Sequence, residues 1–126
     1  MTDMTVDVIL PCLDEADALP KVIARLPTGY RAIVVDNGST DGSADVARAH
    51  GALVVTEPVK GFGSACAAGV AAATADFVAF CDADASMDPA ELPPLVDRVA
   101  SGRVDLALGR RVPTGRGAWA PHARFA

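Results

Sequence analysis

The chain has 126 residues, of which 51% are hydrophobic and 21% charged. This composition is typical of one soluble globular domain and excludes a disordered or fibrous protein. Its formal net charge of −5 argues against a protein that binds nucleic acid by bulk charge. The charge is uneven: residues 61–97 carry six acidic and no basic side chains, and residues 98–126 carry six basic and one acidic. This pattern fits cation binding beside phosphate binding, and it fits ordinary solvated faces equally well.

Short apolar runs alternate with amphipathic segments, which is the pattern of βα units around a mainly parallel sheet. Five strands are predicted, and their continuous apolar runs are typical of strands that helices cover on both faces. The strands are expected at Val6 to Pro11, Ala32 to Asp36, Leu53 to Thr56, Phe77 to Cys81 and Asp105 to Leu108. The predicted fold is therefore a three-layer α/β/α sandwich with a Rossmann-like, mainly parallel sheet.

Four helices are expected between these strands, at about residues 19–26, 42–50, 63–73 and 88–102. The third consists almost entirely of small residues, which let a helix backbone lie close to a sheet or to a ligand. The fourth begins at Asp88 with a capping-box-like sequence and with proline at the first helical position. Glycines and prolines break any regular pattern from Arg110 onward, so we expect a domain over residues 1–111 and an irregular basic tail over 112–126.

The cysteines and the apolar stretches indicate the cellular compartment. Cys12, Cys66 and Cys81 are too widely spaced for a CxxC metal pair and are odd in number, which favours a reduced, cytoplasmic protein. The first residues lack the features of a secretory signal. The longest weakly polar stretch, Ala65 to Cys81, is shorter than the about 20 strongly apolar residues that a membrane-spanning helix needs. We expect no transmembrane segment.

The most informative motif is Asp82-Ala83-Asp84, directly after a predicted strand, because open α/β sheets bind ligands beyond the carboxyl ends of their strands. In an extended chain, residues two apart point to the same side with their Cα atoms roughly 6.5 Å apart. Both carboxylates can then bind one hard cation. Mg²⁺ typically takes one or two protein carboxylates plus phosphate oxygens, so the pair suits Mg²⁺ or Mn²⁺ carrying a diphosphate. Asp-x-Asp is also frequent in exposed turns, where it binds no metal.

Two other motifs overlap this region. Alternate residues from Asp82 to Asp88 match a calcium-binding loop, but Met87 stands where that loop needs glycine. The segment Gly61 to Gly63, with Asp82 about 20 residues later, imitates a dinucleotide-binding fingerprint and would indicate an NAD-dependent oxidoreductase. However, Cys66 stands in place of the third glycine. A lone Gly-x-Gly is weak evidence, so this alternative ranks below the metal site.

Five motifs follow one another along residues 8–111: VILPCLDE, IVVDNGSTDG, KGFG, FCDAD and LGRR. Their order resembles that of family 2 glycosyltransferases with the GT-A fold, including polyprenyl-phosphate sugar synthases of the dolichyl-phosphate mannose synthase type. The resemblance covers about residues 6–111. Members of that family are normally much longer, so we expect a chain truncated after its nucleotide-binding half, with the C-terminal part of the fold missing. No second acidic motif offers a catalytic base.

The resemblance implies that Asp84 and Asp82 are the catalytic, metal-binding pair, with Asp84 the direct ligand of Mg²⁺ or Mn²⁺. The substrate-binding residues that it implies are Pro11, Leu13, Glu15, Asp36, Gly38, Ser39, Lys60, Gly61, Asp82, Ala83 and Arg110. Asp36 is expected to accept a hydrogen bond from the nucleobase, with an Asx turn in its own loop as the alternative, although Asn37 or Ser39 could form that turn instead. Lys60 is expected near the phosphates and Arg110 near the diphosphate, with solvated surface roles as their alternatives.

The function implied by the resemblance is transfer of a sugar from a UDP- or GDP-linked donor to an acceptor. A polyprenyl phosphate or a cell-envelope glycan is the expected acceptor class. Two alternatives stay open: a module that binds nucleotide sugars without transfer, and an inactive fragment. The expected location is the cytoplasm, with peripheral association at the inner face of the membrane and homo-oligomerisation left open. Nucleic acid is not an expected partner.

Overall fold

Four of the predicted apolar runs form a parallel sheet in the computed structural model, which describes residues 5–107. The strands are β1 (Val6–Cys12), β2 (Tyr30–Asp36), β3 (Leu53–Thr56) and β4 (Phe77–Phe80). They lie in the order β3-β2-β1-β4, and each neighbouring pair is parallel. Because every strand runs in the same direction, the loops that follow them meet at one edge of the sheet.

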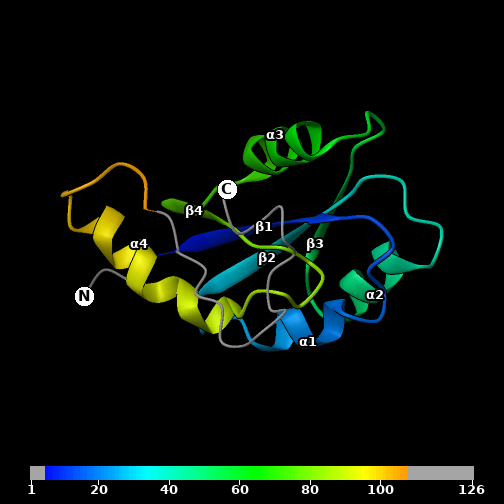
Figure 1. Ribbon diagram of the computed structural model, residues 1–126, viewed down its shortest axis with the longest axis horizontal. Coiled ribbons are helices and arrows are strands. Elements are labelled where there is room, and N and C mark those ends of the chain that lie inside the picture. Colours follow the sequence, from blue (N-terminus) through cyan, green and yellow to red (C-terminus); the bar gives the residue numbers. More distant parts are fainter. Residues whose placement is uncertain (1–4, 108–126) are drawn as a thin grey trace, which may run out of the picture.

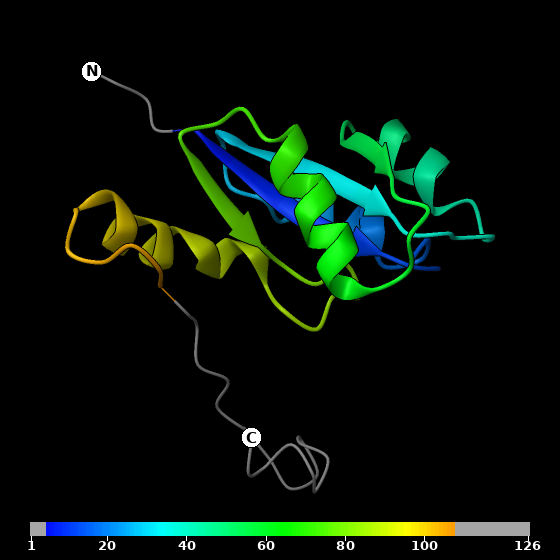
Figure 2. The same ribbon diagram turned by 90° about the horizontal axis from the view of Figure 1, so that it is seen from above.

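Helices cover both faces of this sheet, so the predicted three-layer sandwich is confirmed (Figure 1). The helices are α1 (Leu19–Ala24), α2 (Ser43–Ala49), α3 (Phe62–Ala72) and α4 (Leu92–Ala100), and a 3₁₀ turn η1 (Pro89–Glu91) precedes α4. Figure 2 shows α3 crossing over the strands on one face, and Figure 1 shows α1, α2 and α4 on the other side.

The core is divided into two layers because successive side chains of a strand point to opposite faces. Along β1, Val8 and Leu10 belong to the cluster that packs against α1, α2 and α4, whereas Ile9 belongs to the cluster under α3. In α3, a Cβ at Gly69 would overlap Cγ2 of Ile9. The small residues of α3 therefore allow the close approach to the sheet that the sequence predicted.

The predicted fifth strand is wrong for the residues that the structure describes. Residues 105–107 are not part of the sheet, and Leu106 is 71% exposed; Leu108 lies outside the described residues. A run this short has little strand preference of its own, because strand formation depends on packing against neighbouring strands. Among the described residues β4 has β1 as its only strand neighbour, and its Val78 and Phe80 side chains stay partly exposed.

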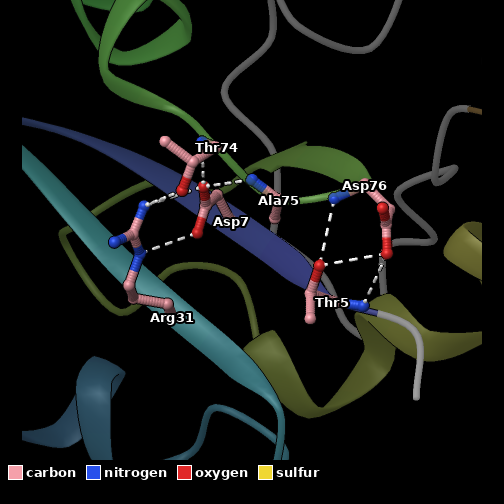
Figure 3. Close-up of polar contacts among 6 residues, drawn as sticks. All are labelled: Thr5, Asp7, Arg31, Thr74, Ala75 and Asp76. Carbon is pink, nitrogen blue, oxygen red and sulfur yellow. Dashed lines mark hydrogen bonds and ion pairs between the residues drawn. The ribbon is translucent and has the colours of Figure 1, made fainter. Parts of the chain in front are cut away.

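A buried carboxylate joins three segments at the amino-terminal edge of the sheet. Asp7 in β1 is 1% exposed and accepts hydrogen bonds from Nε and Nη2 of Arg31 in β2, at 2.8 and 2.9 Å. The backbone N–H groups of Thr74 and Ala75, in the loop before β4, donate to it at 2.8 and 3.0 Å (Figure 3). Burial raises the pKa of Asp7, but these hydrogen bonds outweigh burial and hold the pKa below its usual value.

Candidate functional site

An open cavity of about 400 Å³ lies at the carboxyl edge of the sheet. The residues that line it come from four segments, at or just after the ends of the four strands: Pro11, Cys12, Leu13, Glu15, Asn37, Lys60, Gly61, Phe62, Asp82, Ala83 and Asp84. The structure thus brings together most of the residues to which the sequence assigned a role in binding or catalysis. Whether they bind a ligand stays a prediction.

Asp82 and Asp84 line the cavity from the segment that follows β4, where the chain leaves the strand and enters a turn at Ala83 and Asp84. The N–H of Cys81 donates to the carbonyl of Ile9 at 3.1 Å, which holds the start of this segment against β1. Cys81 and Ala83 are each only 3% exposed, whereas Asp82 and Asp84, which alternate with them, line the cavity. Asp84 Oδ1 also accepts a hydrogen bond from the backbone N–H of Ser86 at 2.9 Å. Both carboxylates therefore line one cavity, although a turn at Ala83 and Asp84 stands where the spacing prediction assumed an extended chain.

The electrostatics of the cavity favour a cation. Glu15, Asp82 and Asp84 contribute three carboxylates, and Lys60 is the only basic side chain among the described lining residues. Burial raises the pKa of Glu15, and the negative charges of Asp84, Asp41 and Asp14 raise it further. A bound divalent cation would relieve this repulsion.

The donor set also fits such a cation. Within residues 5–107, no group of three or more His, Cys, Asp or Glu side chains is arranged to hold a metal ion by itself. Two carboxylates are the number that Mg²⁺ typically takes from protein when substrate phosphates complete its coordination. Burial raises the pKa of the neighbouring Cys81 thiol to about 11, so this sulfur stays protonated at neutral pH and is a poor metal ligand. The hard oxygen ligands of Asp82 and Asp84 suit Mg²⁺ or Mn²⁺.

Reciprocal hydrogen bonds fix the loop after β1 against the loop after β2. Ser39 Oγ accepts from the N–H of Asp14 at 2.9 Å, and Asp14 Oδ1 accepts from the N–H of Thr40 at 2.8 Å. The fully buried Ser43 accepts from the N–H of Glu15 at 2.9 Å. Leu13 and Glu15 are thereby held at the cavity wall. The Ser39 hydroxyl is used in this loop contact, and Ser39 is not among the lining residues.

Asp36 and Gly38, two further predicted substrate-binding residues, are not among the lining residues either. Asp36 is 9% exposed, and its Oδ1 accepts from the N–H of Ser39 at 2.9 Å. The Asp36 carboxylate thus bonds its own loop backbone, as the alternative expected, but three residues on rather than the two of an Asx turn. Gly38 has φ of +108°, and Cε of Lys60 lies 3.7 Å from the position that a Cβ would take there. The Lys60 stem therefore passes over Gly38. Arg110 lies outside the described residues, and its role stays a prediction.

Three lining residues were not predicted from the sequence. Cys12 ends β1, Phe62 begins α3 with 65% of its surface exposed, and Asn37 follows β2. For Asn37, the available signal was its position directly after a strand, where the sequence suggested only a turn residue. Its hydrogen bonds to residues 20 to 24 positions further along the chain could not be read from that position.

Comparison with known proteins gives a consistent picture. Residues 7–124 match the family model described as Glycosyl transferase family 2. An uncharacterized glycosyltransferase of Mycobacterium tuberculosis strain ATCC 25618 / H37Rv is 54% identical over 119 residues, which cover 94% of this chain and 54% of the relative. The chain thus spans about half the length of that relative. An undecaprenyl-phosphate 4-deoxy-4-formamido-L-arabinose transferase of Klebsiella pneumoniae strain 342 is 33% identical over 77% of this chain and 34% of its own length.

Among solved structures, glucosyl-3-phosphoglycerate synthase from Mycobacterium tuberculosis is similar to this chain. Its complex with Mn²⁺, UDP-glucose and phosphoglyceric acid superposes with a TM-score of 0.68 at 34% sequence identity, over 79% of this chain and 40% of the synthase. The same synthase has been crystallised with Mg²⁺ and UDP. The likeness confirms an α/β fold of the GT-A kind for the part of the chain that the superposition covers.

Proposed function

Because this chain belongs to glycosyl transferase family 2, we propose that it transfers a sugar from a nucleoside diphosphate sugar to an acceptor. One observation carries the proposal: Lys60 comes from the loop after β3, Asp82 and Asp84 come from the loop after β4, and all three line the same cavity. A cavity with a pair of carboxylates and one ammonium group has the ligands needed for a metal-bound diphosphate.

The lining residues suggest how the donor lies in the cavity. Pro11, Leu13 and Glu15 offer an apolar and hydrogen-bonding wall for the base and ribose. Lys60 and the first turn of α3 suit the diphosphate, because α3 begins at Phe62 and its N-cap residue, Gly61, has no side chain to cap the first backbone N–H groups of the helix, which suit an anion. Asp82 and Asp84 would hold Mg²⁺ or Mn²⁺. Such an ion supplies a Lewis acid that offsets negative charge on the departing diphosphate.

We propose UDP as the nucleotide and a phosphorylated compound, such as a polyprenyl phosphate, as the acceptor. The similar synthase structure contains UDP-glucose and phosphoglyceric acid, and the Klebsiella relative is named for undecaprenyl phosphate. No helix among the described residues is long and apolar enough to cross a bilayer.

The first experiment measures binding of UDP-glucose and GDP-mannose by calorimetry, with Mn²⁺ and with a chelator. We expect UDP-glucose to bind at least about tenfold more tightly with Mn²⁺, which corresponds to about 1.4 kcal/mol. The variant Asp84→Asn should lose that metal-dependent gain. Asp97→Asn is the matched control, because Asp97 is an exposed aspartate on α4 outside the cavity. Equal affinity with and without metal would contradict the proposal.

The second experiment separates a transferase from a module that only binds the donor. Release of UDP from UDP-glucose is followed with and without a polyprenyl phosphate or phosphoglycerate. UDP release that depends on the acceptor supports transfer. Metal-dependent binding without release in the presence of either acceptor would favour the binding module. Preference for GDP-mannose in the first experiment would replace UDP by GDP in the proposal.

A further inference from the structure

Asn37 connects the end of β2 to a loop that lines the cavity, here called the 57–61 loop (residues 57–61). Its side-chain nitrogen donates to the carbonyls of Glu57 and Val59, at 2.9 Å each. Its side-chain oxygen accepts from the N–H of Gly61 at 2.9 Å. The backbone N–H of Asn37 donates to the carbonyl of Cys12 at 2.9 Å. Asn37 is only 8% exposed, so these hydrogen bonds are largely shielded from water.

The contacts fall on every second residue of the 57–61 loop, and Lys60 lies between two of them. The N–H of Glu57 also donates to the carbonyl of Asp36 at 2.9 Å, which fixes the beginning of the loop. The loop ends at Gly61, whose φ of 130° is a backbone conformation that residues other than glycine rarely adopt. The buried side-chain amide of Asn37 therefore fixes the backbone on both sides of Lys60 and at the N-cap of α3.

We propose that Asn37 is a positioning residue that sets Lys60 and the first turn of α3 against the diphosphate of the donor. The inference rests on the proposed function, since it assigns the diphosphate to this part of the cavity. Asn37 does not need to touch the substrate for this role. Its effect passes through the 57–61 loop.

The chemistry of the loop requires an amide rather than a carboxylate. Two carbonyl oxygens need donors, and one N–H needs an acceptor; the side chain of asparagine supplies both kinds of group. An ionised aspartate has no donor, so it would face the carbonyls of Glu57 and Val59 with unfavourable oxygen-to-oxygen contacts. It would also add a fourth carboxylate to a cavity that already has three.

The test compares UDP with uridine, both in the presence of Mn²⁺, because only UDP carries the diphosphate. We expect Asn37→Asp to weaken UDP binding about tenfold or more and to change uridine binding by no more than about twofold. Equal weakening of both would indicate a general loss of structure and would overturn the inference. Asp97→Asn again serves as the control. Thermal unfolding of each variant shows whether it folds.

A double-mutant cycle keeps the inference testable if Asn37→Asp is too unstable. If Asn37 acts through Lys60, then Asn37→Ala should weaken UDP binding much less in a Lys60→Ala background than in the wild-type chain. Additive effects would overturn the inference. Hydrogen exchange of the Gly61 amide should also accelerate in Asn37→Ala, and unchanged protection would count against the proposed contact.

The outcomes also separate this inference from the proposed function. If the wild-type chain fails to bind UDP in the presence of Mn²⁺, both the positioning role and the proposed function are overturned. Normal UDP binding by wild type and by the Asn37 variants would overturn the positioning role alone and would leave the proposed function standing.

Discussion

Replacing Gly69 by alanine tests how closely α3 packs on the sheet beside the cavity. A Cβ at this position would overlap Cγ2 of Ile9 and lie 3.0 and 3.1 Å from its Cγ1 and Cδ1. Ile9 is fully buried in the middle of β1, so its side chain cannot move without displacing its neighbours. Relief of the overlap must come from a shift of α3 or of the strand.

The expected loss of stability follows from two opposing contributions. Alanine in place of glycine within a helix gains about 1 kcal/mol in helix propensity. Overpacking a filled core costs about 1–3 kcal/mol, and three close contacts with one buried side chain place Gly69→Ala in the upper half of that range. The free energy of unfolding should therefore fall by about 1–2 kcal/mol.

Gly63→Ala is the matched control, because Gly63 lies in the same helix and a Cβ there would have no neighbour within 4 Å. This variant should gain about 0.5–1 kcal/mol, since only the propensity changes. Urea unfolding followed by circular dichroism measures both variants, and their changes should have opposite signs. A Gly69→Ala protein as stable as the Gly63→Ala protein would refute the close packing of α3 on Ile9.

Two further predictions concern buried polar groups. Asp7→Asn should lower the free energy of unfolding at pH 7 by about 2 kcal/mol, because it weakens charge-assisted hydrogen bonds to Arg31. The pKa of Asp7 is lowered by folding, so its contribution is complete above the usual aspartate range and is lost as the pH falls through the folded pKa. The difference between variant and wild type should therefore shrink in acid, and a constant difference would contradict the reasoning. Ser43→Ala should lower the free energy of unfolding by about 1–2 kcal/mol, because the Glu15 N–H loses a buried acceptor. Ser39→Ala should lower it by only about 0.5 kcal/mol, because water can reach the more exposed N–H of Asp14. If urea unfolding ranks the two serines in the reverse order, the result contradicts these loop contacts.

The loops beside the cavity show where local sequence is sufficient. The Asp-x-Asp spacing predicted that Asp82 and Asp84 would share one side, and the structure places both in the cavity with Ala83 buried between them. The shared cavity follows from the position of the pair directly after a strand, whereas the extended backbone assumed for the pair is replaced by a turn at Ala83 and Asp84. Four of the five predicted strands and all four predicted helices are present among the described residues.

Asp7 and Asn37 show where local sequence is insufficient. Asp7 lies inside an apolar run, and its burial is compensated by hydrogen bonds from Arg31, 24 residues away, and from Thr74 and Ala75, 67 and 68 residues away. Asn37 looked like a turn residue, and its partners lie 20 to 24 residues further along the chain. The sequence by itself thus determined the layers, the main elements and the carboxylate pair, because periodicity and spacing act between near neighbours. The tertiary structure alone decided the strand order and the partners of the buried polar groups, because a hydrogen bond between distant segments depends on how the whole sheet assembles.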